Sequence, residues 1–318
     1  MQFLALAEKE GAAVPLMIAD RVMGISLMST GDIAQGRAHL SRATAVYEPR
    51  EHRPLAMRFG HDNRVAALSY RSWALWFLGY PDAALADAEN ALKDAREIEQ
   101  AATLMYALAH VSFPNIFCGN YVKANALAEE ISVLAAQKAA SQWQALGMMN
   151  RGCVLALTGK ASDAAEILTS AIAAMRVTGA TAWMPLFLSY LALAYAKLDQ
   201  FDDSWRCLGE ATAIVDSTKE KWHEAEVHRI GGEIALKSPL PDTAKAEAYF
   251  NRALSVARQQ QAKSWELRAA MSMARLWRDQ GKRDEARELL APVYGWFTEG
   301  FGTLDLKDAK ALLDELTA

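Results

Sequence analysis

The sequence predicts an all-α fold, a right-handed superhelical solenoid of about seven helix pairs that ends in a capping helix. A short phrase recurs along its 318 residues, in which a turn glycine is followed five residues later by an alanine. The alanine, or a small residue in its place, stands at positions 36, 84, 124, 164, 204, 246 and 286, in steps of 48, 40, 40, 40, 42 and 40. A second series, of tryptophans at 143, 183, 222 and 265, has almost the same period. A fixed period of this size indicates stacked repeats.

Each repeat reads as a first helix, a tight turn and a second helix. Around Gly159, Met148 and Leu155 fall at helical spacing upstream, and Ala164 and Leu168 do so downstream. We expect the alanine to lie where the two helices cross, because a small side chain lets their backbones approach closely. The tryptophans open first helices, where we expect their rings to seal one unit against the previous one.

We expect one helical-repeat domain over residues 1–318. Its units are predicted near 12–47, 63–99, 101–139, 141–178, 181–217, 222–260 and 263–299, with a one-sided capping helix over 303–317. Phe3–Glu10 reads as the second helix of a preceding unit, so the chain is expected to be a fragment of a longer protein. An orphan second helix would expose an apolar face, which makes self-association through the N-terminal end a further expectation.

Composition excludes several classes of protein. The net charge of −4 and the pI near 5.9 give no basic stripe, so we expect no nucleic-acid partner. The three cysteines are widely spaced and form no C-x-x-C pair, which favours a reducing cytoplasm. No secretory signal opens the chain, and no apolar run approaches the ~18 residues of a membrane-spanning helix. We therefore expect a cytoplasmic protein with no membrane partner.

The repeat resembles the tetratricopeptide repeat family. The likeness rests on a small residue in the first helix, the anchor alanine and a large residue four positions later; these are Gly24, Gly152 and Gly232, then Ala84, Ala124, Ala164 and Ala286, then Leu168, Leu208, Phe250 and Leu290. The family's usual unit has about 34 residues. The period here is about 40, a length shared by HEAT-like repeats.

A closer resemblance covers almost the whole chain. Stretches at 75–81, 225–230, 264–270 and 290–301 resemble the C-terminal helical region of large bacterial signalling proteins, which carry a class III nucleotide cyclase domain and a predicted NTPase domain. The resemblance implies a regulatory or sensing part whose partners include those adjoining domains. Gly159–Lys160 and Gly281–Lys282 lack the rest of a phosphate-binding loop, and no nucleophile elbow is present. We therefore expect no enzyme activity in this chain.

In tetratricopeptide arrays the first helix of each pair lines the concave face. Carried onto this sequence, the groove positions are Ser69, Trp73, Trp76, Tyr106, Phe113, Ile116, Met149 and Cys153, followed in the last unit by Arg268, Met271, Arg275 and Arg278. An exposed apolar concavity usually marks a ligand or partner site. The alternative is that longer helices turn the apolar positions into core and that Arg275 and Arg278 belong to a solvated face.

The 48-residue step marks an insertion of about eight residues between Tyr47 and Val65. Long loops in compact arrays are often functional. Its polar residues, Arg58, His61, Asp62 and Arg64, precede Trp73 and Trp76 in sequence, so a loop folded over the groove would place polar groups above an aromatic floor. The plain alternative is a surface connection held by proline.

We expect no metal or cofactor. His223, Glu224 and His228 miss the zinc-protease spacing by one residue. The first functional hypothesis is a non-catalytic module that binds a protein or peptide partner. The alternative is a small-molecule sensor that holds an apolar or aromatic ligand in the groove.

Overall fold

The computed structural model describes residues 5–7, 9 and 11–317 of the chain. Within this part of the chain, helices and turns account for the whole structure and no strand occurs, so the all-α prediction is confirmed. The helix expected over Phe3–Glu10 falls in part on residues outside this description. None of the helices that the structure describes combines the length and hydrophobicity needed to cross a lipid bilayer.

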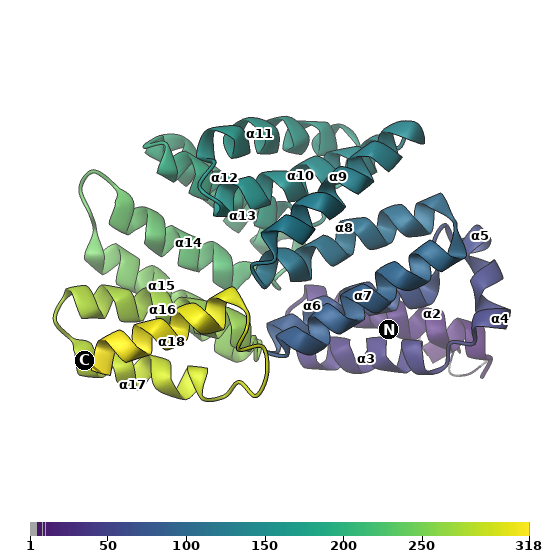
Figure 1. Ribbon diagram of the computed structural model, residues 1–318, viewed down its shortest axis with the longest axis horizontal. Coiled ribbons are helices and arrows are strands. Elements are labelled where there is room, and N and C mark those ends of the chain that lie inside the picture. Colours follow the sequence, from purple (N-terminus) through teal and green to yellow (C-terminus); the bar gives the residue numbers. More distant parts are fainter. Residues whose placement is uncertain (1–4, 8, 10, 318) are drawn as a thin grey trace. The chain divides into compact units, whose positions relative to one another are not determined.

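The helices follow one another as antiparallel pairs joined by short turns (Figure 1). In chain order the pairs are α2 (Ala13–Ser29) with α3 (Ile33–Ala45), α6 (Asn63–Phe77) with α7 (Pro81–Ile98), α8 (Ala101–Phe117) with α9 (Tyr121–Gln137), α10 (Ser141–Leu157) with α11 (Ala161–Val177), α12 (Met184–Lys197) with α13 (Phe201–Thr218), α14 (Glu224–Lys237) with α15 (Thr243–Gln259), and α16 (Lys263–Asp279) with α17 (Arg283–Tyr294). The last helix is α18 (Leu304–Thr317). Short helices α4 (Pro49–His52), η1 (Arg53–Leu55) and α5 (Ala56–Phe59) lie in the predicted insertion.

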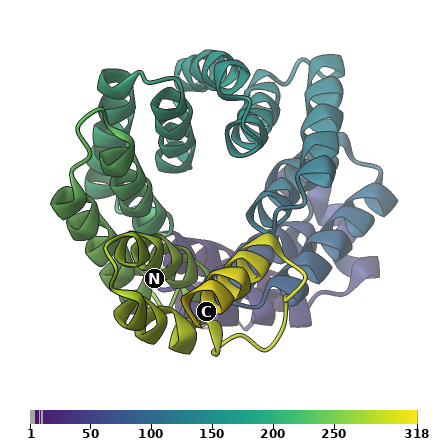
Figure 2. The ribbon, with the colours of Figure 1, turned by 60° about the vertical axis from the view of Figure 1, so that its left-hand side comes forward.

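The chain divides into two compact units. Unit 1 comprises Met1–Trp76 and Pro81–Asn150, and unit 2 comprises Phe77–Tyr80 and Arg151–Ala318. In unit 2 each helix from α12 to α18 contacts the next one in the chain (Figure 2). The first helices also contact one another in order, α12 with α14 and α14 with α16, and α16 contacts the last helix, α18. This is the contact pattern of stacked helix pairs. One continuous array over both units stays a prediction.

The turn glycines end the first helices by a left-handed cap. Gly159 has φ +86°, and the Lys160 N–H reaches back to the Leu155 carbonyl at 3.0 Å. This six-to-one bond satisfies a carbonyl that the helix end would leave free. In the turn before α13 a non-glycine, Asp199, takes the same conformation with φ +59°.

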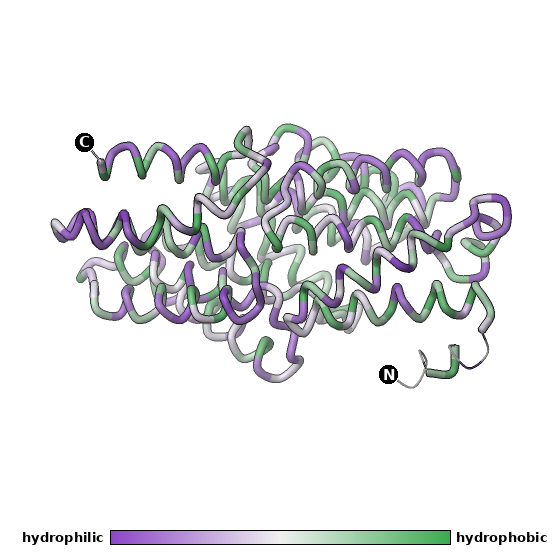
Figure 3. The backbone as a smooth tube through the Cα atoms, turned by 90° about the horizontal axis from the view of Figure 1, so that it is seen from below, coloured by the Kyte–Doolittle hydropathy of each residue, from purple (hydrophilic) through white to green (hydrophobic). Residues whose placement is uncertain are grey.

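Small residues lie at the helix crossings. Gly36 approaches the backbone of α2 so closely that an added Cβ would lie 2.8 Å from the Gly24 carbonyl oxygen. Gly152 faces Leu168, and Gly232 faces the Phe250 ring. Along most helices hydrophobic positions recur at helical spacing (Figure 3). The exception is α8, whose residues from Met105 to Phe117 are all buried because the helix is apolar on every side.

Replacing Ala124 or Ala164 by leucine should lower the free energy of unfolding by roughly 1–3 kcal/mol. Both alanines are fully buried, Ala124 in unit 1 and Ala164 in unit 2, so the extra carbons have no free volume to enter. Thermal melts followed by circular dichroism measure the effect. Ala126 lies in the same helix as Ala124 but is exposed, so an Ala126→Leu variant should keep the wild-type melting temperature. Unchanged melts for both buried variants would contradict the packing.

The tryptophan series splits into two groups. Trp222 and Trp265 are buried, and the Trp265 Nε1–H donates to the Trp222 carbonyl at 3.0 Å, which ties α16 to the segment before α14. Trp143 and Trp183 are partly exposed, although Trp143 sets its ring edge-on to Tyr106 at 5.9 Å. The buried pair therefore joins successive first helices, as expected of rings that pack one helix pair against the next.

Candidate functional site

The predicted aromatic groove lies inside the core of unit 1. Trp73 has none of its surface exposed, and Ser69, Trp76, Tyr106, Phe113 and Met149 are also buried. An exposed aromatic floor at these positions was therefore the wrong expectation, and the core alternative describes them. These residues are buried because the helices are long and apolar. Helix α8, for example, is packed on all its faces.

Several of these rings do come together. His61 stacks on Tyr106 at 4.4 Å, and Tyr106 stacks on His110 at 4.1 Å. The Trp73 Nε1–H donates to the His110 carbonyl at 2.8 Å, and the Trp73 ring meets Phe113 edge-on. Burial lowers the pKa of both His61 and His110 to about 4. The stacked rings of His61, Tyr106 and His110, which we call the aromatic column, are thus uncharged and packed in the core of unit 1.

Hydrogen bonds of Asp62 hold the inserted segment in place. Its buried carboxylate accepts from the Tyr47 hydroxyl at 2.5 Å and from the backbone N–H groups of Arg64 and Val65, so it caps α6. Its own N–H donates to the Thr103 hydroxyl at 3.0 Å. Asp62 therefore positions the segment against α8 and has little capacity left for a ligand.

The other predicted polar residues of this segment diverge. Arg64 pairs with Asp94 of α7, whereas Arg58 is exposed and lies over its neighbour Phe59. Only His61 of the four reaches the aromatic column. The structure thus does not gather the expected polar groups above Trp73 and Trp76.

At the C-terminal end of unit 2, the two predicted arginines are partly exposed. Arg278 donates to Glu315 of α18 at 2.9 Å and also pairs with its neighbour Asp279. Arg275 lies one turn earlier on α16. Arg278 thus belongs to a partly solvated, ion-paired face that holds α18. A role for Arg275 and Arg278 in binding stays a prediction.

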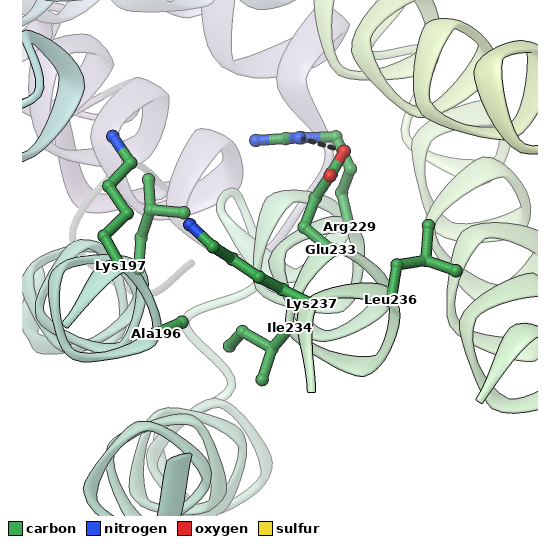
Figure 4. A pocket seen from close by; sticks show the side chains of 8 residues that line it. Ala196, Lys197, Arg229, Glu233, Ile234, Leu236 and Lys237 are labelled. Carbon is green, nitrogen blue, oxygen red and sulfur yellow. Dashed lines mark hydrogen bonds and ion pairs between the residues drawn. The ribbon is translucent and has the colours of Figure 1, made fainter. Parts of the chain in front are cut away.

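Unit 2 contains a hollow that the sequence did not indicate. The hollow, about 530 Å³ in volume and open to solvent, lies between α12 and α14 (Figure 4) and is lined by Leu193, Ala196, Lys197, Arg229, Glu233, Ile234, Leu236 and Lys237. We call it the α12–α14 hollow. Lys197 and Lys237 each end a first helix and stand one repeat period apart, which is the signal in the sequence that would have found it.

Two lysines, Lys197 and Lys237, line the hollow together with Arg229 and Glu233. The Lys197 ammonium donates to the Ala156 carbonyl at 2.6 Å. Burial, and then the charge of Lys237, lower the pKa of Lys197. The Lys237 charge thus adds to burial in disfavouring the charged form of Lys197.

Arg229 and Glu233 of the hollow belong to an ion network centred on the buried Glu226. Arg229 forms two parallel bonds with Glu226, at 2.7 and 2.8 Å, and a third bond to Glu233 at 3.2 Å (Figure 4). Arg268 of α16 bridges Glu226, at 3.4 Å, to Asp305 of α18, at 2.7 Å. The network therefore connects one wall of the hollow to α16 and α18.

The network fixes the charge on its members. Burial raises the pKa of Glu226, but the Arg229 and Arg268 cations outweigh it and hold that pKa at about 2. Burial lowers the pKa of Arg229, and the Glu226 carboxylate more than offsets this. Both side chains stay ionised at neutral pH, with their hydrogen-bonding groups committed to each other.

No protein-family model matches the sequence, and no curated protein matches it. Among solved structures, the chain is similar to a Rap protein complexed with Competence and Sporulation Factor, with a TM-score of 0.64 at 12% identity over 96% of this chain and 77% of that one. It is also similar to the apo form of RapI, with a TM-score of 0.57 at 13% identity over 94% and 99% of the two chains. Aspartyl phosphate phosphatase F from Bacillus subtilis gives a TM-score of 0.57 at 12% identity, over 95% and 75%.

At these identities the likenesses show the fold alone. Together with the stacked helix pairs they place the chain in the class of tetratricopeptide-like helical-repeat folds.

Proposed function

We propose that this chain is a non-catalytic protein-interaction module, the regulatory or sensing part of a signalling protein, and that it receives a segment of a partner polypeptide in the α12–α14 hollow. The observation that carries the proposal is the lining of this hollow. Apolar side chains and charged ones face the same open space, which suits an extended peptide with mixed side chains.

The likeness to other folds of this class supports the proposal. One neighbour was crystallised with Competence and Sporulation Factor, and another, with a TM-score of 0.53 at 14% identity, is the quorum sensor NprR from B. thuringiensis. Scaffolds of this kind thus carry sensing and partner-binding roles in other proteins, and repeat arrays generally bind through the surfaces that stacking creates.

A peptide selection tests the proposal. A random peptide library is selected on the whole chain, and the tightest binder is synthesised with a fluorescent label for polarisation titrations. Leu193→Ala and Leu236→Ala in the hollow should weaken binding at least tenfold, because each removes part of the partly exposed apolar wall. Val122→Ala, at an exposed site in unit 1, is the matched control and should leave binding unchanged. Binders indifferent to both hollow substitutions would contradict the proposal.

The link to a nucleotide cyclase and an NTPase domain rests on the sequence resemblance. We propose that these domains adjoin the chain in the parent protein. Reading the coding sequence upstream of Met1 tests this directly. A cyclase and an NTPase domain in the same frame would support it, and a natural start at Met1 would refute it.

The alternative is a small-molecule sensor. The residues of its predicted aromatic groove are buried in the core, so the α12–α14 hollow is the site that this alternative would use. The volume of the hollow is in the range of small-molecule pockets. The open hollow favours the peptide, because a small ligand usually needs to be enclosed on most sides. A fragment that saturates the hollow and abolishes peptide binding would favour the sensor.

A further inference from the structure

We infer that unit 2 carries a second partner-binding surface, a groove between α13 and α15 that receives an amphipathic helix of a partner polypeptide. We call this surface the α13–α15 groove, and it lies within unit 2. The inference goes beyond the proposed function, because that function uses the hollow between the first helices α12 and α14, whereas α13 and α15 are second helices.

Facing side chains of two helices form the walls of the groove. One face of α13 carries, at helical spacing, Trp205, Gly209, Thr212 and Asp216, and one face of α15 carries Lys245, Tyr249 and Arg252. The Trp205 and Tyr249 rings stack with their centres 5.9 Å apart, and the Lys245 ammonium lies 3.8 Å from the centre of the Trp205 ring. The two faces therefore meet over α14, on which both helices pack.

A pocket in the groove offers room for one side chain of a partner. It has a volume of about 150 Å³ and is lined by Thr212, Val215, Asp216, Glu224, Val227, His228 and Arg252. Its two valines are buried, whereas Asp216 and Arg252 are exposed. A free ligand usually occupies a pocket of ~300–1,000 Å³, so this smaller one suits part of a larger partner.

Gly209 shows how closely that partner can approach. Each of the other glycines inside helices lies against a neighbouring helix, as Gly152 does against Leu168 and Gly232 against Phe250. At Gly209, which is exposed in the middle of α13, an added Cβ would have no packing neighbour within 4 Å among the described residues. Glycine destabilises a helix interior relative to alanine, and packing within the chain gives no reason for it here. A helix that crosses α13 from outside would supply the missing neighbour.

The charges of the two walls define the partner further. Lys245 and Arg252 put cations on the α15 wall, and Asp216 puts an exposed carboxylate on the α13 wall. Arg252 bonds Glu224 at 3.3 Å, but 59% of its side chain is exposed, so it can take a further acceptor. An amphipathic helix with one acidic and one basic edge would pair both walls and lay its apolar stripe over the two aromatic rings. Trp, Tyr and Arg are also the residues that most often carry binding energy at interfaces.

A library of helical peptides tests the groove. Displayed amphipathic helices with one acidic and one basic edge are selected on the whole chain carrying Leu193→Ala and Leu236→Ala, so that the α12–α14 hollow does not compete. The tightest binder is labelled with a fluorophore and titrated by polarisation. Adding Gly209→Leu should weaken binding at least tenfold, because the leucine fills the space of the helix crossing. Ala173→Leu, at an exposed position of the second helix α11, should leave binding unchanged.

Gly209→Ala separates binding from folding. It should raise the melting temperature, because alanine stabilises a helix interior, and yet weaken the binder at least threefold. A lower melting temperature would show that packing within the chain requires the glycine, and would overturn the inference.

A charge reversal tests where the helix lies. Lys245→Glu should weaken the binder at least fivefold, and replacing one acidic residue of the peptide by lysine should restore its affinity for this variant. A library that enriches no binder, or binders indifferent to either Gly209→Leu or Lys245→Glu, would overturn the groove and leave the proposal for the α12–α14 hollow standing. A dimer of the free chain that Gly209→Leu dissociates, seen by sedimentation, would overturn the partner helix in favour of a second copy of this chain.

Discussion

Replacing Arg229 by methionine should lower the free energy of unfolding of unit 2 by about 3–5 kcal/mol. Glu226 is only 1% exposed and takes two of its bonds from Arg229. Without that partner, the contact that the described residues leave to the buried carboxylate is the longer one with Arg268, at 3.4 Å. The cost therefore comes from stranding a charge in the core, more than from the net value of the ion pair.

Urea unfolding, followed by hydrogen exchange in peptides from α14 and α16, measures the loss in unit 2. Arg206→Met provides the matched control, because Arg206 pairs with Asp203 on the surface, where both side chains are about half exposed or more. That substitution should cost less than about 1 kcal/mol. Adding Glu226→Gln to Arg229→Met should restore part of the stability, since it removes the stranded charge. An Arg229→Met variant as stable as the Arg206→Met control would contradict this account.

The helix pairs were predictable because their signals are local. The left-handed turn at Gly159 and the small residue at the crossing are each read within a few positions of the sequence. Gly152 facing Leu168 and Gly232 facing Phe250 follow from one short phrase that repeats. Steric constraints of this kind recur in every repeat, so the periodicity of the sequence reveals the positions that they occupy.

The burial of Trp73 was not predictable from the same pattern. Its place in a groove was carried over from a shorter repeat, and added residues rotate a helix face by about 100° each. Asp62 shows the same limit for polar groups, since its partners Tyr47 and Thr103 are 15 and 41 positions away. The ion network of Glu226 and Asp305 likewise joins helices that the sequence separates. Contacts between helices far apart in the sequence decide all of these.

Lowering the pH from 6.5 to 5 should destabilise both units, through His61 and His110 in unit 1 and His223 in unit 2. Burial lowers the pKa of His110 to about 4 and that of His223 to about 3, against an ordinary value near 6.5. Below pH 6.5 the unfolded chain takes up these protons while the folded chain does not. Stability is therefore fully present above pH 6.5 and is lost as the pH falls towards the folded values, by at most about 1.4 kcal/mol per pH unit for each histidine.

The structure explains why neither ring accepts the proton. The His110 Nδ1–H donates to the Tyr106 carbonyl at 2.7 Å, and the ring is stacked between aromatic neighbours. The His223 Nε2–H donates to the Ser189 oxygen at 3.0 Å, while Nδ1 is buried with no hydrogen-bond partner among the described residues. Protonation of either ring would place a charged imidazolium in the core, and at His223 the new N–H at Nδ1 would find no acceptor among the described residues.

The pH window separates these histidines from Glu226. The lowered pKa of Glu226 makes its contribution disappear only between about pH 4.5 and 2, below the range tested. Urea titrations between pH 5 and 7, with hydrogen exchange assigning the loss to each unit, should give a reduced slope in unit 1 for His110→Gln and in unit 2 for His223→Gln. Each variant serves as the control for the other, because its substitution lies in the other unit. A slope in unit 2 that His223→Gln leaves intact would show that another group takes up the proton on unfolding.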